Sequence, residues 1–578
     1  MTQNVGQFLR DVRALAAPYW SSEERWAARG LAAVVIALSL GRVGLLVALN
    51  RWYQEFYDAL QQLDRTAFWR LIGYFAALAT VYIAVAVYQL YLQQMLQIRW
   101  RRWLTEQHID DWLANRAYYR LSLDESGTDN PDQRIAEDLR IFVDGSLDLS
   151  LGLLSSVVTL ASFVGILWTV SGSWAVPGTS LSIPGYMVWA AILYAILGTW
   201  LTQRVGRPLA RLNFLQQRYE ANFRFGLVRV RESSEAIALY RGERAESHRL
   251  ADHFASVWSN WWEIMRRRKK LGSLTAGYEQ AATLFPFIVA APRFFAKEIQ
   301  LGGLMQISNA FGRVQDALSW FVSAYVGIAE WKATVDRLIS FRRAIIALRA
   351  QAGLDGIQVA PGADGEVVLR GLSLSLPGGE TLLRDVEEKL VPGEPVLVTG
   401  PSGCGKSTLF RALAGIWPFG SGTIERPDAS RCLFLPQKPY LPIGSLRAAI
   451  AYPSAADAFA DDAVRARLRA CDLAQLEGRL DEVDHWEQRL SPGEQQRLAF
   501  ARALLHAPSW LFLDEASSAL DAETETTLYA LLEQELPQTT WISIGHRMSI
   551  ERFHRRRLAF GRGGLDSKSL AGAVSVPA

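Results

Sequence analysis

One long stretch of the chain carries no charged side chain. Residues 149–203 contain no Asp, Glu, Lys or Arg, although these four types make up 21% of the 578-residue sequence. A helix that crosses a bilayer needs about 20 mainly apolar residues, so the stretch has room for two crossings joined by a Gly- and Pro-containing loop at residues 171–184. A soluble protein is therefore disfavoured, and a membrane-embedded helical domain is expected.

The apolar pattern predicts six membrane spans in all. Polar segments at residues 103–146 and 205–270 are long enough for the flanking helices to continue past the membrane and to end in a short connecting helix. Residues 6–20 mix apolar and charged positions, which predicts either an amphipathic helix at the interface or a frayed terminal tail. The spans are placed at about residues 28–50, 71–93, 149–170, 185–201, 271–292 and 299–326.

Lys and Arg gather on one side of these spans, which predicts the orientation. They precede the first span and follow the second and the fourth, at Arg25, Arg29, Arg99, Arg101, Arg102, Arg204, Arg207 and Arg211. By the positive-inside rule, the N-terminus is cytoplasmic and residues 171–184 lie outside. The net charge of +3 is small for this length and indicates no nucleic-acid partner.

Charged and amide side chains interrupt the first, fifth and sixth predicted spans. A charge at membrane depth is unfavourable by at least a few kcal/mol, so it normally faces a cavity or a partner. Three of these residues are spaced i, i+3 and i+7, which puts them on one helix face. The face is expected to line a water-filled path, with an inter-helix salt bridge as the alternative. The candidate path residues are Arg42, Glu279, Gln306, Asn309, Arg313 and Asp316.

A phosphate-binding loop follows a short apolar run in the C-terminal part of the chain. Residues 400–408 read Gly-Pro-Ser-Gly-Cys-Gly-Lys-Ser-Thr, and a helix-compatible segment follows. The glycines let backbone N–H groups surround phosphate oxygens at a helix N-terminus. Lys406 is expected to reach the β- and γ-phosphates of ATP, and the Ser407 hydroxyl to ligate Mg²⁺. The expected nucleotide-binding residues here are Gly400, Ser402, Gly403, Cys404, Gly405, Lys406, Ser407 and Thr408.

A second nucleotide motif lies about a hundred residues further on. Four apolar residues, 510–513, precede Asp514 and Glu515. A buried strand in this position can hold Asp514 beside the Mg²⁺ while Glu515 polarises an attacking water molecule. Together with the phosphate-binding loop, this motif predicts an α/β domain that hydrolyses ATP.

Further motifs resemble those of the ATP-binding-cassette (ABC) ATPases. Residues 490–497, Leu-Ser-Pro-Gly-Glu-Gln-Gln-Arg, resemble the Leu-Ser-Gly-Gly-Gln signature, and residues 434–437 resemble the Q-loop. Residues 517–521 match the D-loop, and His546 matches the switch histidine. The resemblance implies catalytic roles for Gln437 and His546, with Gln437 also at the metal. It also implies that ATP lies between two such domains and contacts Ser491, Gly493 and Asp521.

Two positions depart from the ABC pattern. Pro492 replaces the first signature glycine and has no backbone donor, so no γ-phosphate hydrogen bond is expected there. Leu376 takes the place of the aromatic residue that usually stacks on adenine, so the base contact is expected to be apolar packing. The other positions of the signature remain available for nucleotide.

Nearly the whole chain resembles one ABC group. Residues 130–138, residues 234–246, and residues 415–418 with 435–441 are similar to the group of the bacterial SbmA/BacA peptide-uptake proteins, their ATPase-fused BclA- and YddA-like relatives, and the peroxisomal fatty-acyl transporters of subfamily D. This implies a six-helix, all-α transmembrane domain of exporter-like fold at residues 1–345, a linker at 346–365, and an α/β P-loop nucleotide-binding domain at 366–578. It also implies that residues 128–138 and 233–246 couple the two domains.

With one nucleotide domain and six spans, the chain is expected to act as a dimer, most simply a homodimer, in the lipid bilayer of a bacterial inner membrane. Polar residues in the fifth and sixth spans favour ATP-driven import of a hydrophilic cargo, such as peptides that include antimicrobial ones. Fatty-acyl or lipid transport is the first alternative, and export of peptides or drugs is the second. A soluble ATPase that regulates another machine is opposed by residues 149–203.

Overall fold

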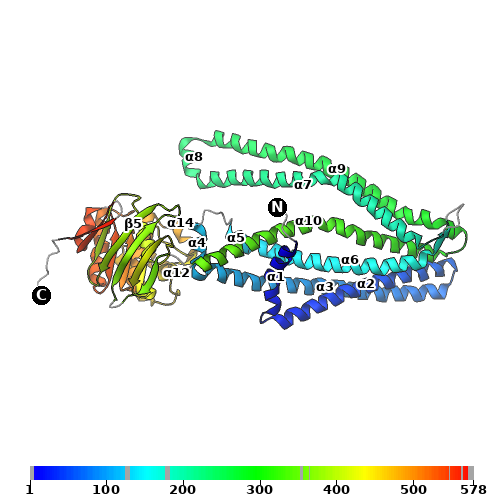
Figure 1. Cartoon of the computed structure of the whole chain (residues 1–578), viewed down its shortest axis with the longest axis horizontal. Coiled ribbons are helices and arrows are strands. Elements are labelled where there is room, and N and C mark those ends of the chain that lie inside the picture. Colours follow the sequence, from blue (N-terminus) through cyan, green and yellow to red (C-terminus); the bar gives the residue numbers. More distant parts are fainter. Residues whose placement is uncertain are drawn as a thin grey trace. The chain divides into compact units, whose positions relative to one another are not determined.

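The computed structural model describes residues 5–123, 130–175, 182–351, 356–362, 365–545, 547–561 and 564–570. The chain divides into two compact units (Figure 1). The first consists of Met1–Ile109 and Asn130–Phe341, and the second of Asp110–Asp129 and Arg342–Ala578. Each unit is described by itself below.

The first unit is built from long helices, and every predicted span lies within one of them except for a residue or two at the start of two spans. The helices also extend well beyond the predicted spans, as the lengths of the polar segments predicted. The long helices are α1 (Val5–Ser21), α2 (Arg25–Gln61), α3 (Arg65–Leu113), α6 (Leu139–Ser171), α7 (Tyr186–Glu232), α9 (Glu243–Phe295) and α10 (Leu301–Gln351). The short elements are α5 (Pro131–Gln133), the π-helical turn η2 (Arg134–Asp138), α8 (Ser234–Tyr240), β1 (Ser173–Ala175) and β2 (Ser182–Pro184). Because α1 is helical throughout, a frayed tail is wrong for residues 5–21.

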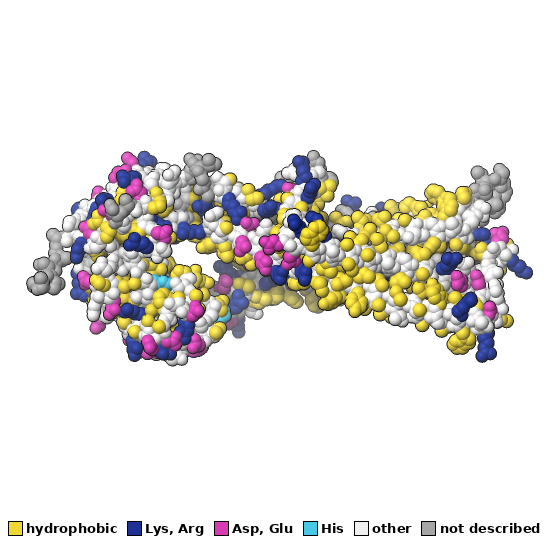
Figure 2. Space-filling view, turned by 90° about the horizontal axis from the view of Figure 1, so that it is seen from below, with side chains coloured by type: hydrophobic (Ala, Val, Ile, Leu, Met, Phe, Trp, Pro, Cys, Tyr) yellow, Lys and Arg dark blue, Asp and Glu magenta, His cyan; other side chains and the backbone are white. Residues whose placement is uncertain are grey.

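Four helical stretches are long and apolar enough to cross a membrane. Among the described residues these are Arg25–Gln61, Arg65–Leu123, Pro131–Ser171 and Tyr186–Glu232. The predicted fifth and sixth spans, in α9 and α10, are not among them and stay predictions. Figure 2 shows apolar side chains over much of the helical unit, with charged side chains concentrated toward its ends.

The start of α10 is held by the end of α2. The backbone N–H groups of Leu301 and Gly302 donate to Gln61 Oε1 at 2.7 Å and Asp58 Oδ1 at 2.8 Å. These donors belong to the first turn of α10 and have no partner within the helix. A Cβ on Gly302 would lie 2.0 Å from the carbonyl oxygen of Gln54. Glycine is therefore required where the two helices approach.

A buried ion cluster ties the beginning of α6 to α10. The Asp138 carboxylate accepts hydrogen bonds from Arg134 Nη1 at 2.6 Å and from Arg337 Nε and Nη2 at 2.9 and 2.7 Å. Asp138 is 1% exposed. A charge buried to this degree is tolerated only when it is paired and hydrogen-bonded. The cluster therefore fixes how η2 and α10 pack together.

The second unit is the predicted α/β domain, with two main sheets and a short two-stranded one in which β9 (Gly444–Ser445) pairs with β10 (Val483–Asp484). One has the strand order β14-β13-β6-β12-β11-β8, in which only β14 is antiparallel to its neighbour; the other has the order β3-β7-β4-β5. The strands are β3 (Gln358–Pro361), β4 (Val367–Ser375), β5 (Thr381–Leu390), β6 (Val396–Thr399), β7 (Gly420–Arg426), β8 (Cys432–Leu435), β11 (Trp510–Asp514), β12 (Thr540–Ile544), β13 (Arg556–Gly561) and β14 (Gly564–Ser569). Helices that matter for the site are η1 (Ala114–Arg116), α4 (Ala117–Leu123), α11 (Lys406–Leu413), α15 (Pro492–His506) and α16 (Ala522–Glu535).

The domain boundaries differ from the predicted ones in two ways. At least half of the predicted linker, residues 346–365, is regular structure, because α10 continues to Gln351 and β3 pairs in parallel with β7. In addition, Asp110–Asp129 belongs to the compact unit of the nucleotide domain. The Gly- and Ala-rich composition of the segment indicated a linker, but such a segment can still pair at the edge of a sheet.

Candidate functional site

The phosphate-binding loop joins β6 to α11, as predicted. Gly400 and Gly405 have φ values of 153° and 105°, a region that side chains other than glycine rarely adopt. A Cβ on Gly400 would also lie 2.6 Å from Phe560 Cβ. Lys406 is 5% exposed, and its ammonium donates to the carbonyl oxygens of Gly400 and Pro401, both at 2.8 Å. The lysine therefore closes the loop at the N-terminus of α11.

The other predicted loop residues keep their places around this turn. Ser402 and Gly403 are exposed, Cys404 and Ser407 are half-buried, and Thr408 is buried on α11. The loop thus presents backbone N–H groups and short side chains at a helix N-terminus, where anions are favoured.

The predicted metal ligands Ser407 and Asp514 lie together. The Ser407 hydroxyl donates to Asp514 Oδ1 at 3.0 Å, which links the start of α11 to the end of β11. Burial raises the pKa of the Asp514 carboxyl above its ordinary value, and the neighbouring Glu515 carboxylate adds to the rise. A partly desolvated carboxylate in this position favours a nearby cation.

Glu515 and Gln437 meet at the carboxyl edge of the same sheet. Gln437 follows β8, which pairs in parallel with β11, and its Nε2 donates to Glu515 Oε2 at 3.2 Å. Glu515 has a φ of 50°, and its N–H donates to the carbonyl oxygen of Ile544 at the end of β12. The backbone therefore holds this carboxylate in a defined place. His546 follows β12 but lies outside the described residues.

The signature residues begin α15. The Ser491 hydroxyl accepts from the backbone N–H of Glu494 at 3.3 Å, and the Ser491 N–H donates to Glu494 Oε2 at 2.9 Å, which together form a capping box. The hydrogen bond from the Ser491 N–H keeps the pKa of Glu494 below its ordinary value. Pro492 occupies the first helical position, where an N–H would have no intrahelical partner. The proline therefore suits the helix start, and Gly493 lies half-buried beside it.

Gln496 is a residue whose role the sequence did not single out. Its Nε2 donates to the carbonyl oxygen of Gln437 at 3.0 Å and to Ser518 Oγ at 3.2 Å, while its Oε1 accepts from Ala519 N–H at 2.9 Å. One buried amide thus joins α15, the Q-loop and the D-loop. Its only sequence signal is its place in the stretch at 490–497.

The other two predicted nucleotide contacts, Asp521 and Leu376, lie outside the phosphate-binding loop. Asp521 caps α16 and accepts from Glu523 N–H at 3.0 Å and Thr524 N–H at 2.8 Å. Leu376 follows β4 and packs against the core of the nucleotide domain. Their contacts with nucleotide stay predictions.

Residues 114–123 attach to the nucleotide fold; they lie in the polar segment 103–146, but the predicted coupling residues within that segment were 128–138. Arg116 Nη1 donates to the carbonyl oxygens of Ala414 and Gly415 at 3.0 and 2.9 Å, just after α11. Asn115 and Arg116 have φ values of 51° and 56°, which turn the chain sharply before α4. The predicted coupling segment at 128–138 lies further along, and its described part, from Asn130, belongs to the first unit. The second predicted segment, 233–246, contains the short helix α8.

The structure brings three of the candidate path residues together and separates the others. Arg313 and Glu279 both act electrostatically on the Asp316 carboxyl, across α10 and α9. Gln306 is only 6% exposed, and its backbone carbonyl oxygen accepts from Asn50 Nδ2 of α2 at 3.2 Å. Asn309 and Arg42 are half-buried on α10 and α2. This face of α10 therefore turns toward α2, and a path-lining role for Gln306 stays a prediction.

The phosphate loop, the paired carboxylates and the capped signature helix define the second unit as an ATP-binding-cassette domain, joined to a helical membrane domain. Residues 15–295 match the family ABC transporter transmembrane region 2, and residues 383–518 match the ABC transporter family. The chain belongs to the ABC transporters, as a half-transporter with one transmembrane region and one ATP-binding domain.

Individual relatives cover nearly the whole chain. An uncharacterized ABC transporter ATP-binding protein of Haemophilus influenzae is 38% identical over 91% of this chain and 88% of its own length. The inner membrane ABC transporter ATP-binding protein YddA of Escherichia coli is 34% identical over 93% and 94%. A bacterial Atm1-family ABC exporter with ATP bound has the same fold, with a TM-score of 0.72 and 20% identity over 94% and 95%. The predicted YddA-like identity and exporter-like fold are confirmed.

Proposed function

We propose that the protein is a homodimeric, ATP-driven inner-membrane transporter that imports peptides or other hydrophilic solutes by alternating access. The single observation that favours a hydrophilic cargo is that Glu279, Arg313 and Asp316 lie within the predicted fifth and sixth spans, near enough for the charges of Glu279 and Arg313 to act on the Asp316 carboxyl. Charges at membrane depth normally face a cavity or a partner. The proposed orientation, with the N-terminus and the ATPase domain in the cytoplasm, follows from the distribution of Lys and Arg.

In the proposed ATPase cycle, the positions of the loop residues, Glu515 and Gln437 support their roles, and the role of His546 rests on the resemblance to the ABC switch histidine alone. The glycine loop and Lys406 bind the phosphates, and Glu515, held by Gln437, accepts a proton from the attacking water molecule. Ser491, Gly493 and Asp521 face the nucleotide held by the second copy, and His546 assists hydrolysis.

The residues present fit Mg²⁺ as the metal. The hydroxyl of Ser407 and the carboxylate of Asp514 are adjacent oxygen donors, and Gln437 can add its amide oxygen. When bound, Mg²⁺ supplies positive charge that neutralises the phosphate oxygens.

A second copy would cover the apolar surface of the α7–α8–α9 hairpin. In Figure 1 the α8 end of this hairpin lies apart from the other long helices of its unit. Its exposed large apolar side chains outside the predicted spans, where lipid does not cover them, include Phe214, Phe225, Phe254, Trp258 and Trp262. Exposed apolar patches of this kind mark interaction sites or lipid contact. This surface supports the homodimer.

Import can be tested in intact cells. Cells that lack the protein are expected to accumulate less of a labelled antimicrobial peptide than cells complemented with it, and Glu515→Gln should not restore uptake. If deleted and complemented cells accumulate equal amounts of the peptide, the import hypothesis is wrong. An ATPase response in liposomes to acyl-CoA, with none to peptide, would instead favour the fatty-acyl alternative, which the likeness to subfamily D suggested.

Arg116→Ala is expected to weaken coupling between the ATPase and transport. The variant loses two charge-assisted hydrogen bonds. Because the side chain is exposed, we expect the free energy of attachment to weaken by about 1.5 kcal/mol, the lower end of the range for such bonds, which is roughly tenfold in the attachment equilibrium. Peptide uptake per ATP hydrolysed should therefore fall, with nucleotide affinity unchanged. Arg120→Ala is the matched control, since it removes an arginine from α4 and leaves both hydrogen bonds in place. Equal uptake per ATP in both variants would show that the attachment at Arg116 is dispensable.

A further inference from the structure

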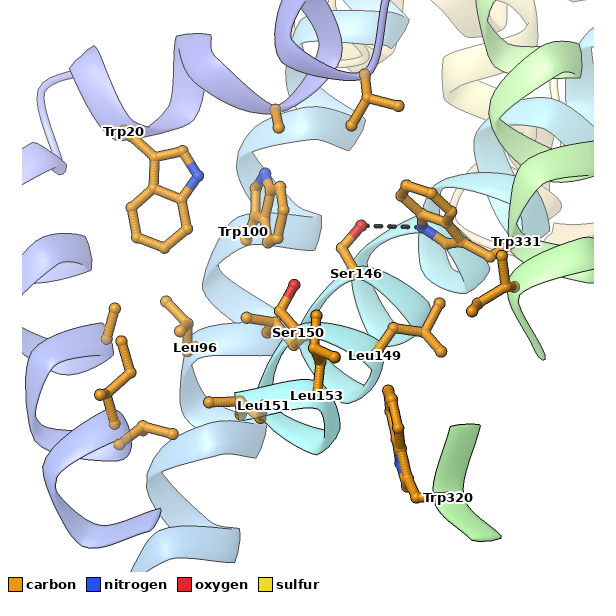
Figure 3. A pocket seen from close by; sticks show the side chains of 17 residues that line it. Trp20, Leu96, Trp100, Ser146, Leu149, Ser150, Leu151, Leu153, Trp320 and Trp331 are labelled. Carbon is orange, nitrogen blue, oxygen red and sulfur yellow. Dashed lines mark hydrogen bonds between the residues drawn. The ribbon is translucent and has the colours of Figure 1, made fainter. Parts of the chain in front are cut away.

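An apolar cavity of about 590 Å³ lies within the helical unit, among α1, α2, α3, α6 and α10 (Figure 3). This volume is typical of sites that take a small molecule, which span about 300 to 1,000 Å³. Four indole rings line it, those of Trp20, Trp100, Trp320 and Trp331. No residue of the proposed ATPase cycle or of the candidate transport path lines this cavity.

The walls of the cavity are firmly packed. A Cβ on Gly145 of α6 would lie 2.6 Å from the Trp331 ring, and one on Gly152 would lie 2.8 Å from the Trp320 ring. Trp331 Nε1 also donates to Ser146 Oγ at 3.0 Å. The indoles on α10 are therefore held against α6 by close contact with glycines, and the cavity is part of the native packing.

The cavity crosses the predicted membrane boundary. Its lining in α2 and in α6 includes Ala32 and Leu153, inside the predicted first and third spans, whereas Trp20 and Trp100 lie outside the predicted spans on the N-terminal side. Tryptophan is enriched at this depth because its ring is apolar and its N–H is polar. One end of the cavity is therefore at headgroup level and the other in the hydrocarbon region.

The lining chemistry selects the ligand. Apart from the hydroxyls of Ser146 and Ser150 and the indole N–H groups, the lining side chains are hydrocarbon, and none is charged. A peptide backbone or a hydrated solute would leave polar groups unpaired there. At the headgroup end, Arg29 Nε donates to the backbone carbonyl oxygen of Trp20 at 3.1 Å, which places a guanidinium beside the backbone of this lining residue. An arginine in this position suits a phosphate.

We propose that this cavity holds one acyl chain of an anionic phospholipid from the leaflet on the N-terminal side, with the lipid phosphate near Arg29. The lipid belongs to the surrounding bilayer and is not the transported cargo. It fills the space between α1 and the long helices, so that α1 is attached to the rest of the unit partly through lipid.

The test uses purified full-length protein in bilayer nanodiscs that contain phosphatidylcholine and phosphatidylglycerol with a photoreactive group in mid-chain. After irradiation, crosslinked lipid is mapped by mass spectrometry. We expect crosslinks on α6 near residues 149–153 and on α10 near Trp320 in the wild type. Ala32→Phe should reduce them at least about tenfold, because its ring occupies the volume in which methylene groups are buried.

The matched control is Ala33→Phe, since Ala33 is exposed on the same helix and does not line the cavity. It should crosslink like the wild type, and Ser150→Leu serves as a second filling variant if Ala32→Phe misfolds. Arg29→Gln should keep the chain crosslinks and lose the preference for phosphatidylglycerol over phosphatidylcholine.

Several outcomes would overturn the proposal. The proposal is wrong if Ala32→Phe and Ala33→Phe crosslink to lipid equally, or if both variants lose the lipid crosslinks. It is also wrong if free fatty acid or peptide cargo displaces the lipid, or if a second copy of the chain crosslinks at these sites. Peptide uptake is not part of this measurement, so a wrong cargo assignment would leave the lipid result unaffected.

Discussion

Replacing Glu515 with glutamine is expected to lower the rate of ATP hydrolysis by about 10²- to 10⁴-fold, the usual contribution of a positioned general base. Glutamine keeps the size of the side chain and a partner for Gln437 but cannot accept a proton. The backbone at Glu515 is fixed by its N–H bond to Ile544 and by its positive φ, so the variant should keep the local fold. Phosphate release at saturating ATP measures the effect.

ATP should still bind to this variant, because the glycine loop and Lys406 are unchanged. The expected signature is therefore lost turnover with ATP retained on the protein after gel filtration. Glu533→Gln is the control, as it makes the same chemical change at an exposed position of α16 and should hydrolyse ATP at the wild-type rate. Sustained hydrolysis in Glu515→Gln would remove Glu515 from the role of base.

The nucleotide site was largely predictable because its geometry is local. A buried strand, a glycine loop and a helix place Lys406 and Ser407 by chain connectivity alone, and a second strand that ends in Asp514 must reach the same edge of a parallel sheet. The hydrogen bond between Ser407 and Asp514 then follows from strand pairing. The long helices were predictable for a similar reason, since the lengths of polar segments limit where a helix can turn.

Contacts between distant segments were not predictable in the same way. Arg116 reaches Ala414 and Gly415, about three hundred residues further along the chain, and no periodicity or spacing records such a contact. The surroundings of Gln306 could not be predicted for a related reason. Its spacing placed it correctly on one face of α10, but which neighbouring helix that face meets depends on tertiary packing.

Asp138→Asn is expected to produce the largest loss of stability among changes in the helical unit, about 3 kcal/mol, the lower end of the range for breaking a buried ion pair. The lower end applies because Arg337 has a side chain that is 40% exposed and can be solvated when its partner is lost. The Arg134 side chain is only 9% exposed, so water cannot solvate it in the same way. When the detergent-solubilised proteins are heated, the variant is expected to lose its monodisperse size-exclusion peak at a lower temperature than the wild type.

The matched control for this variant is Asp336→Asn, which breaks an exposed ion pair with Lys332 on the same helix as Arg337. Exposed pairs contribute about 0 to 1 kcal/mol, so this control should melt close to the wild type.

The pH dependence of the Asp138→Asn effect gives an independent check. Burial raises the pKa of the Asp138 carboxyl, but the hydrogen bonds and charges of Arg337 and Arg134 outweigh burial and leave the pKa below its ordinary value. A carboxyl with a lowered folded pKa stabilises the fold above its unfolded pKa of about 3.9. This stabilisation is lost as the pH falls through the folded value. The difference between wild type and Asp138→Asn should therefore stay constant from neutral pH to about pH 4 and narrow only below it, and a difference that narrows already between pH 7 and 5 would contradict the ion cluster as its source.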